Sequence, residues 1–196
     1  MPKLLRTFIT WSARFSRRTV WAVGCLVLGL AAGLASAVYA LGNIGLIEAR
    51  TQNGWSEWNL SEKSLTLPYA LGHFLALGQV PPTRTGRQFI RKTDDAGKLL
   101  SSSCVAVLSG VVPAARWWTL AATAPDGTIQ PERGVLAAGQ AVLEANGRLV
   151  ATVSDEPSPG NWLVPARSTY MLVLTLHDTG EAGGTFDLPA VTQADC

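Results

Sequence analysis

The sequence contains few of the residues on which most enzymes rely for chemistry. It has only 2 histidines and 3 cysteines in 196 residues. His73 and His177 occur without a nucleophile elbow, an HExxH or CxxC motif, or a glycine-rich phosphate loop. We therefore expect no catalytic residues, no metal site and no cofactor, and the sequence favours a role other than catalysis.

Three other groups of residues could support catalysis only if the fold assembled them. Ser101-Ser102-Ser103 could form a triad with His177 and Asp178. The acidic pairs Asp94-Asp95 and Asp155-Glu156 could act as the two carboxylates of a glycosidase. Both pairs fall in predicted turns, where solvated acids are common, so we interpret them as solvated turn residues.

Charge is absent from a long segment near the N-terminus. No charged residue occurs between Thr19 and Ile47, and no acidic residue precedes this segment. Since about 20 apolar residues span the hydrocarbon core of a bilayer, residues 19–47 are predicted to form a transmembrane helix that acts as a signal anchor. Residues 1–18 are basic and predict a cytoplasmic tail, because cytoplasmic flanks carry an excess of Lys and Arg. We expect a single-pass protein of the bacterial inner membrane, with the lipid bilayer as a partner and residues 48–196 in the periplasm.

The same segment allows two other interpretations. Ala35-Ser36-Ala37 resembles the cleavage site of a signal peptide, and cleavage after Ala37 would release a soluble domain. The apolar run continues beyond this site through Ile44 and Ile47, which favours an uncleaved anchor. Ser16-Arg17-Arg18 resembles a twin-arginine export signal, although two arginines at a membrane edge also act as ordinary topology determinants.

Small residues recur at a spacing of four within the predicted helix. Gly29, Gly33 and Ala37 leave one helix face with little side-chain bulk, so another helix could approach closely. This pattern predicts a partner in the membrane, either a second copy of the chain or a larger envelope protein. Glycine is also common in membrane helices generally, and the motif alone leaves both interpretations open.

Residues 48–196 have the length of one domain that can bury a single core. They contain all 14 acidic residues and 11 of the 16 basic ones, so their formal charge is 11 minus 14, or −3. Because the sequence gives no clustered basic face, we expect no nucleic-acid partner. Cys104 and Cys196 are the only cysteines outside the predicted helix, and in an exported domain we expect them to form a disulfide.

The patterns within this domain are mostly those of strands. Ser168 to Asp178 alternates between apolar and polar residues, with Tyr170 and three leucines on the apolar face. Asn146-Gly147 is a hairpin signal, and Pro68 to Leu77 is predicted to form a helix that ends before a glycine. The fold class is mainly β, an antiparallel β-sandwich or jelly-roll-like domain with one or two short helices. The predicted strands cover residues 87–92, 99–109, 116–124, 140–145, 148–154 and 168–178.

Two adjacent tryptophans suggest a binding surface. Trp117 and Trp118 must point to opposite faces of a strand, so one of them is exposed or covers a groove if the other enters the core. An exposed indole beside Arg116, Asn161 and Trp162 could stack on a sugar or hold an apolar ligand. Arg116, Trp117, Asn161 and Trp162 are therefore the candidate ligand-binding residues. In the alternative interpretation, these aromatic side chains simply fill the ends of the sandwich.

At these residues the chain resembles a known family. The resemblance covers most of residues 53–196 and points to the DUF1214 family of bacterial envelope proteins. It implies a β-rich periplasmic domain, often on a single N-terminal helix and commonly encoded beside or fused to a larger DUF1254 domain. The segments that carry it are Asn53-Gly54-Trp55, Arg116-Trp117-Trp118-Thr119-Leu120, Pro125-Asp126-Gly127 and Gly160-Asn161-Trp162-Leu163-Val164-Pro165.

The chain departs from the family pattern around Pro68. Family members tend to have an acid before this proline and an Arg-Ala pair after it, whereas this chain has Leu67, Leu71 and Gly72. The resemblance implies no catalytic residues. We therefore expect a structural or accessory subunit of a cell-envelope complex, with a carbohydrate- or lipid-binding module as the alternative and a hydrolase as the third hypothesis.

Overall fold

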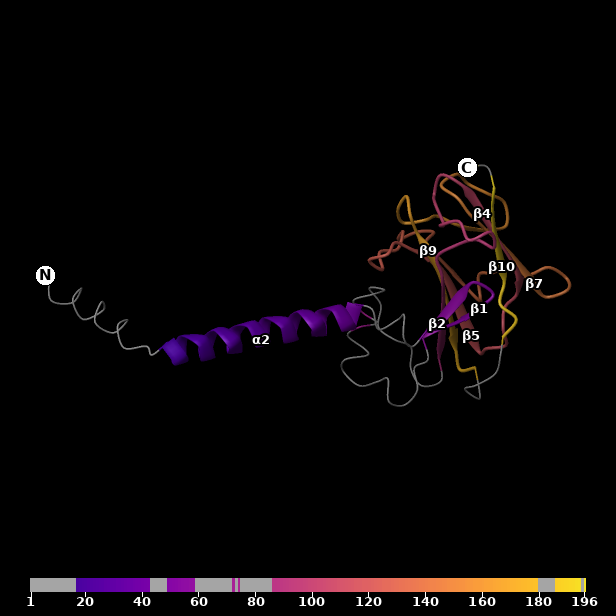
Figure 1. The fold of residues 1–196 in the computed structure, drawn as a ribbon. Coiled ribbons are helices and arrows are strands. Elements are labelled where there is room, and N and C mark those ends of the chain that lie inside the picture. Colours follow the sequence, from indigo (N-terminus) through magenta and orange to yellow (C-terminus); the bar gives the residue numbers. More distant parts are fainter. Residues whose placement is uncertain are drawn as a thin grey trace, which may run out of the picture. The chain divides into compact units, whose positions relative to one another are not determined.

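The chain divides into two compact units, Met1–Ala40 and Leu41–Cys196. The fold in Figure 1 is a computed structural model that describes residues 17–42, 49–58, 72, 74, 86–179, 186–194 and 196. The described part of the first unit is one long helix, and the second unit holds ten strands among its described residues.

The helix α2 covers Arg17–Gly42 and contains 26 residues. At 1.5 Å per residue it is about 39 Å long, which exceeds the thickness of a bilayer core. An 18-residue window within its segment Arg17–Ala40 has a mean hydropathy of 2.0, and the segment is long and apolar enough to cross a membrane. The prediction of one long N-terminal apolar helix is confirmed, although the helix begins two residues before the predicted Thr19 and residues 43–48 lie outside the described part.

The second unit is mainly β and consists of two sheets, as the sequence predicts. In the first sheet the strand order is β1 (Ala49–Gln52), β2 (Trp55–Trp58), β3 (Arg87–Arg91), β9 (Met171–His177), β5 (Trp117–Thr123) and β6 (Val135–Ala137). In the second sheet it is β10 (Ala190–Ala194), β4 (Val105–Val111), β7 (Arg148–Val153) and β8 (Asn161–Leu163). Figure 1 shows β10 beside β4 near the C-terminus. The expectation of an antiparallel β-sandwich is wrong at one place, because β7 and β8 pair in parallel.

One apolar core joins the two sheets. On β9 the predicted apolar face is buried, and Leu172, Leu174 and Leu176 belong to the same cluster as Leu108 and Leu149 of the other sheet. The opposite face of β9 is also partly buried, with Val173 only 2% exposed. A strand covered on both sides lies in the middle of a sheet, which agrees with the place of β9 between β3 and β5.

Three loops of the domain share one conformation. In each, the first residue pairs with the fifth through its backbone, and a glycine at the fourth position has a φ of +80° or +83°. This is a type I turn followed by a G1 bulge, a common three-residue hairpin connection that needs a glycine at the left-handed position. The loops are Asp94–Lys98, Ala124–Thr128 and Glu144–Arg148.

The turn predicted at Asn146-Gly147 is therefore present, but the hairpin predicted around it is not. Residues 140–145 form no strand, and beyond the turn bond from Glu144 N to Arg148 O their pairing with β7 is one isolated bridge between Leu143 and Leu149. β7 pairs instead with β4 and β8. Pairing with strands far away in the sequence has overridden the local hairpin signal.

A two-residue hairpin occurs at another Asn-Gly pair, for which the sequence predicts no flanking strands. Asn53 and Gly54 have φ values of +50° and +76° and connect β1 to β2. Positive φ at both positions is the type I′ turn that Asn-Gly favours. A Cβ atom on Gly54 would lie 2.8 Å from Arg91 Cζ, so glycine also leaves room for that side chain.

Two further predictions need correction or lie outside the described residues. The strand predicted from Leu99 begins only at Val105, because Ser101 and Cys104 close a turn through their backbone at 3.1 Å. Of the helix predicted over Pro68 to Leu77, the structure describes only Gly72 and Phe74, both helical. The rest of that segment, including His73, lies outside the described residues.

A buried arginine joins the first hairpin to the rest of the domain. Arg91 is 1% exposed, and its guanidinium lies 5.9 Å from the centroid of the Trp55 ring. It donates hydrogen bonds to the carbonyls of Asn53 (2.5 Å) and Thr93 (2.7 Å) and to Asp95 Oδ1 (2.5 Å). These contacts link β1, β2, β3 and the 94–98 loop.

The same cluster holds the C-terminal strand β10. Trp55 Nε1 donates to the carbonyl of Pro189 at 2.8 Å. The backbone nitrogen of Asp95 donates to Val191 O at 2.8 Å, and Val191 N donates to Asp95 Oδ2 at 3.1 Å. The β1–β2 hairpin, through Arg91, and the C-terminal strand β10 are therefore both bound to the 94–98 loop.

The domain has two ends, which differ in the residues they carry. At the end that we call the β1 end, the strand registers bring together the first or last residues of β1, β4, β5, β7 and β9. Only residues 112–116 separate β4 of one sheet from β5 of the other there. At the opposite end, which we call the disulfide end, β4 begins and β10 ends. The strand termini at the β1 end are Ala49, Val111, Trp117, Arg148 and His177.

Candidate functional site

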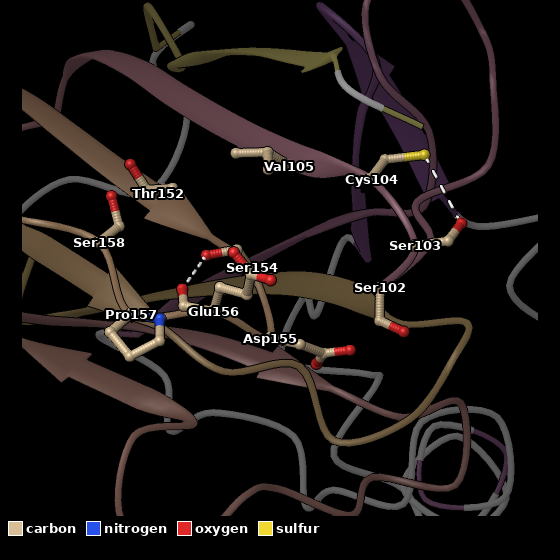
Figure 2. Close-up of a pocket in the computed structure, with 10 residues that line it drawn as sticks. All are labelled: Ser102, Ser103, Cys104, Val105, Thr152, Ser154, Asp155, Glu156, Pro157 and Ser158. Carbon is tan, nitrogen blue, oxygen red and sulfur yellow. Dashed lines mark hydrogen bonds between the residues drawn. The ribbon is translucent and has the colours of Figure 1, made fainter.

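A pocket of about 570 Å³ opens at the disulfide end. Figure 2 shows that its lining comes from two segments, the turn before β4 and the loop after β7. Most of its side chains carry oxygen, and none of the residues that line it is basic. The oxygen-bearing side chains are those of Ser102, Ser103, Thr152, Ser154, Ser158, Asp155 and Glu156.

Strand alternation and a short network of hydrogen bonds position this lining. Val153 is buried in the core, so its neighbour Thr152 points away from it toward the outer face of the four-stranded sheet. Ser154 Oγ donates to the carbonyl of Glu156 at 2.7 Å, as drawn in Figure 2. Trp162 Nε1 donates to Ser154 O at 3.0 Å. The loop after β7 is thus fixed to β8.

A disulfide between Cys104 and Cys196 adjoins the pocket. Cys104 is buried at the start of β4, whereas Cys196 is exposed and lies 3.0 Å from Lys98 Nζ through its sulfur. Ser103 Oγ lies 2.9 Å from Ser101 Oγ. The disulfide fastens the last residue of the chain to the sheet that forms one wall of the pocket.

The pocket offers hydrogen-bonding groups and negative charge but no assembled catalytic group. Ser102 lies at the disulfide end, whereas His177 lies at the β1 end, and the rise of β9 between Met171 and His177 is about 20 Å. The triad considered from the sequence is therefore not assembled. Among the described residues, no group of three or more His, Cys, Asp or Glu side chains could hold a metal ion.

Tyr170 is a buried titratable residue that we considered as a catalytic acid or base. It is 2% exposed, and its hydroxyl has no hydrogen-bond partner among the described residues. Burial, and secondarily the negative charge of Asp155, raise the pKa of Tyr170 well above its usual range. The hydroxyl therefore stays protonated at neutral pH and cannot act as a base.

Of the turn pair Asp94-Asp95, which we expected to be solvated, Asp95 is exposed but Asp94 is buried. Asp94 is 7% exposed, and its Oδ1 accepts hydrogen bonds from Lys98 N (2.8 Å) and Ala96 N (3.0 Å). The hydrogen bond from the Lys98 backbone, aided by those from Gln193 and Ala96, holds the pKa of Asp94 below its usual value. Asp95 is bonded to Arg91 and β10, so both acids hold the structure together. The pair Asp155-Glu156 is exposed.

The four candidate ligand-binding residues lie on different sheets, and one is fully engaged by the backbone. Asn161 begins β8 and is 7% exposed. Its Oδ1 accepts from Val142 N at 2.7 Å, and its Nδ2 donates to Val142 O (2.7 Å) and Val150 O (2.8 Å). This amide connects the 138–147 segment to β7 and β8. These three hydrogen bonds give Asn161 a structural role.

The other three candidates fall into two places. Trp118 is 8% exposed in the core, and Trp117 is 45% exposed, so the two indoles do point to opposite faces. Arg116 is exposed beside Trp117 and forms a 3.8 Å ion pair with Asp178. Trp162 lies instead next to the pocket loop, with the Arg133 guanidinium 5.4 Å from its ring. Trp117 and Arg116 therefore belong to the β1 end.

The family of the domain follows from its sequence. Residues 85–181 match the profile described as "Protein of unknown function (DUF1214)". The chain contains a DUF1214 domain. The resemblance is thereby confirmed over residues 85–181, which contain the segments 116–120, 125–127 and 160–165, whereas Asn53-Gly54-Trp55 lies outside the matched region. Nothing in the match indicates a paired DUF1254 domain, and no curated protein matches the sequence.

A solved structure has a fold similar to that of this chain. The VPA0106 protein from Vibrio parahaemolyticus matches with a TM-score of 0.57 at 14% identity, over 92% of this chain and 46% of that protein. An uncharacterised protein from Burkholderia cenocepacia matches with a TM-score of 0.49 at 16% identity, over 82% of this chain and 40% of that protein. The chain thus spans about half the length of the structures it matches. At this identity the likeness shows the fold alone.

Proposed function

We propose that the chain is a single-pass membrane protein whose DUF1214 domain lies outside the cytoplasm and serves as an accessory subunit of a cell-envelope complex. The observation that carries the proposal is the exposure of α2. Leu26, Leu28 and Leu30 are 71–73% exposed, and no charged residue occurs between Thr19 and Ile47. A helix that is apolar all round needs an apolar surrounding, and a bilayer supplies it.

Two further features support an extracytoplasmic domain. The disulfide between Cys104 and Cys196 fits an oxidising compartment such as the periplasm. The segment before α2 contains basic residues and no acid, which fits a cytoplasmic N-terminus. On this proposal the site after Ala37 stays uncleaved.

The accessory role is supported by what the domain lacks among its described residues and by its size. The triad considered from the sequence is not assembled, because Ser102 and His177 lie at opposite ends, and no group of three or more His, Cys, Asp or Glu side chains among the described residues could hold a metal ion. The chain also covers only 46% of VPA0106, so more than half of that protein has no counterpart in this chain. A separate subunit, such as a DUF1254 protein, or a second copy of this chain would complete a larger assembly through the membrane helix.

The experiment is crosslinking of the tagged chain in intact membranes, followed by mild solubilisation and mass spectrometry. We expect a stoichiometric partner and a mature chain that retains its N-terminus. A lone chain that begins near Val38 would contradict both the anchor and the subunit.

Two matched helix variants test whether the small-residue face of α2 contacts the partner. Added Cβ atoms at Gly24, Gly29 and Gly33 would meet no atom within 4 Å, so none of these glycines is required by the chain's own packing. Because Gly24 lies on the opposite helix face from Gly33, we expect Gly33→Leu to lower the crosslinked fraction several-fold and Gly24→Leu to leave it unchanged. Equal crosslinking in the two variants would rule out this face as the contact.

A second candidate function is a binding module for carbohydrate. The pocket at the disulfide end favours it, because five hydroxyls and two carboxylates in about 570 Å³ can bond to the hydroxyls of a sugar. Trp162 is the reporter, since its indole donates to Ser154 O beside the pocket. Peptidoglycan oligosaccharides should shift its fluorescence, and Asp155→Asn should weaken the response about tenfold. Trp162→Phe is the control that removes the signal, and an unchanged spectrum of the native chain with these glycans would exclude them as ligands.

A further inference from the structure

Within residues 86–179, most of the exposed large hydrophobic side chains lie at the β1 end. Among residues 86–179, six large hydrophobic side chains are exposed, and four of them lie at this end. A soluble monomer seldom gathers its exposed apolar side chains at one place, so the concentration indicates a contact surface. The four are Val111 (52% exposed), Trp117 (45%), Val142 (68%) and Leu143 (49%).

The backbone brings these side chains to neighbouring positions. Val111 pairs with Arg148 in the register of β4 and β7, and Leu143 bridges to the next residue of β7, Leu149. Trp117 packs over Gly139, where an added Cβ would lie 3.2 Å from the indole. The surface therefore extends from the start of β5 across the segment 139–143 to the start of β7.

The charges on this surface are mixed. Arg116 is 83% exposed beside Trp117, and its partner Asp178 is 55% exposed at 3.8 Å. An amphipathic indole with an arginine beside it is the combination that proteins place at the boundary between lipid and water. A contact with the lipid–water boundary needs only such a surface and no deep apolar pocket.

The position of β1 in the chain connects this surface to a membrane. Ala49 begins β1 at the same end, and only residues 43–48 separate it from Gly42, the last residue of α2. Whatever conformation six residues take, they cannot extend beyond about 25 Å. If α2 crosses a bilayer, the covalent chain keeps the β1 end near the lipid headgroups.

We propose that the β1 end of the domain contacts the outer interface of the membrane, with Trp117, Val142 and Leu143 among the lipid headgroups. The inference rests on the proposed function, because it requires α2 to be inserted. The partner that covers this apolar surface is the lipid bilayer. The disulfide end, with its hydroxyl-lined pocket, then faces away from the lipid and is open to periplasmic ligands.

Quenching of tryptophan fluorescence by brominated lipid tests the contact. The full-length chain is reconstituted into phosphatidylcholine vesicles whose acyl chains carry bromine near the headgroup end, and the emission is compared with that in unbrominated vesicles. We expect Trp117→Phe to lower the quenched fraction and Trp162→Phe, at the pocket loop, to leave it unchanged. The combined change Val142→Ser and Leu143→Ser should also lower it, while the indole of Trp117 stays in place.

The Trp21→Phe variant in the same quenching experiment shows whether a negative result contradicts only the lipid contact of the β1 end or also the insertion of α2. Trp21 lies in α2, so Trp21→Phe should lower the quenched fraction if the helix is inserted. Quenching that depends on Trp21 but not on Trp117 would overturn the inference and leave the anchor intact. Quenching that depends on neither tryptophan would overturn both.

Discussion

Replacement of Arg91 by methionine is expected to destabilise the domain by about 3 to 5 kcal/mol. The guanidinium is 1% exposed and donates to the carbonyls of Asn53 and Thr93 as well as to Asp95. Methionine fills much of the same volume but leaves both carbonyls without a donor. A carbonyl left without a donor costs about 1 to 3 kcal/mol when it is buried, and the bonds of these two carbonyls to Arg91 are partly buried. Asp95 adds less, because its side chain is 45% exposed and water can solvate it.

The measurement is denaturant unfolding of the full chain in detergent, followed by tryptophan fluorescence. Arg116→Met is the matched control, because Arg116 is 83% exposed in a 3.8 Å ion pair and its loss should cost about 0 to 1 kcal/mol. Arg91→Lys should restore little, since one ammonium cannot donate in three directions with the fork geometry of a guanidinium. Unfolding of Arg91→Met at the same denaturant concentration as Arg116→Met would contradict a stabilising role for the network.

This network also explains why part of the fold could not be predicted from sequence. The apolar helix, the alternating strand β9 and the exposed and buried faces of Trp117 and Trp118 follow from local spacing, and the structure contains all of them. Arg91, by contrast, has the same spacing as an exposed strand arginine. Its burial depends on a hairpin that lies 38 residues earlier in the chain.

The contacts of the candidate residues could not be predicted for the same reason. Asn161 is a candidate ligand-binding amide because it stands beside a tryptophan, and its hydrogen-bond partners Val142 and Val150 come from segments 19 and 11 residues away. Asp94 looked solvated because it begins a turn, but Gln193 from β10 covers it. The pocket was missed altogether, since Thr152 and Ser102 meet only when β4 and β7 pair. Residue type and spacing give the turn, but only the sheet register gives the neighbours.

Removal of the disulfide is the second change with a large expected effect. Cys104 and Cys196 close a loop with a sequence separation of 92 residues. Chain-entropy reasoning gives about 4 to 5 kcal/mol for a loop of this length. We expect Cys104→Ser and Cys196→Ser each to lower the free energy of unfolding by nearly this amount. The measurement is the same unfolding experiment without reductant. Cys25→Ser is the control, because Cys25 is a free thiol in α2.

The two large effects should not be additive, because both interactions hold β10. The disulfide fixes its C-terminal end, while Asp95, positioned by Arg91, bonds to Val191 near its start. If β10 detaches once either attachment is lost, the second substitution removes a contact that is already broken. The double variant Arg91→Met and Cys196→Ser should therefore lose less stability than the sum of the single losses, by about 1 kcal/mol or more. Strict additivity would mean that the other contacts of β10, including its pairing with β4, keep it docked.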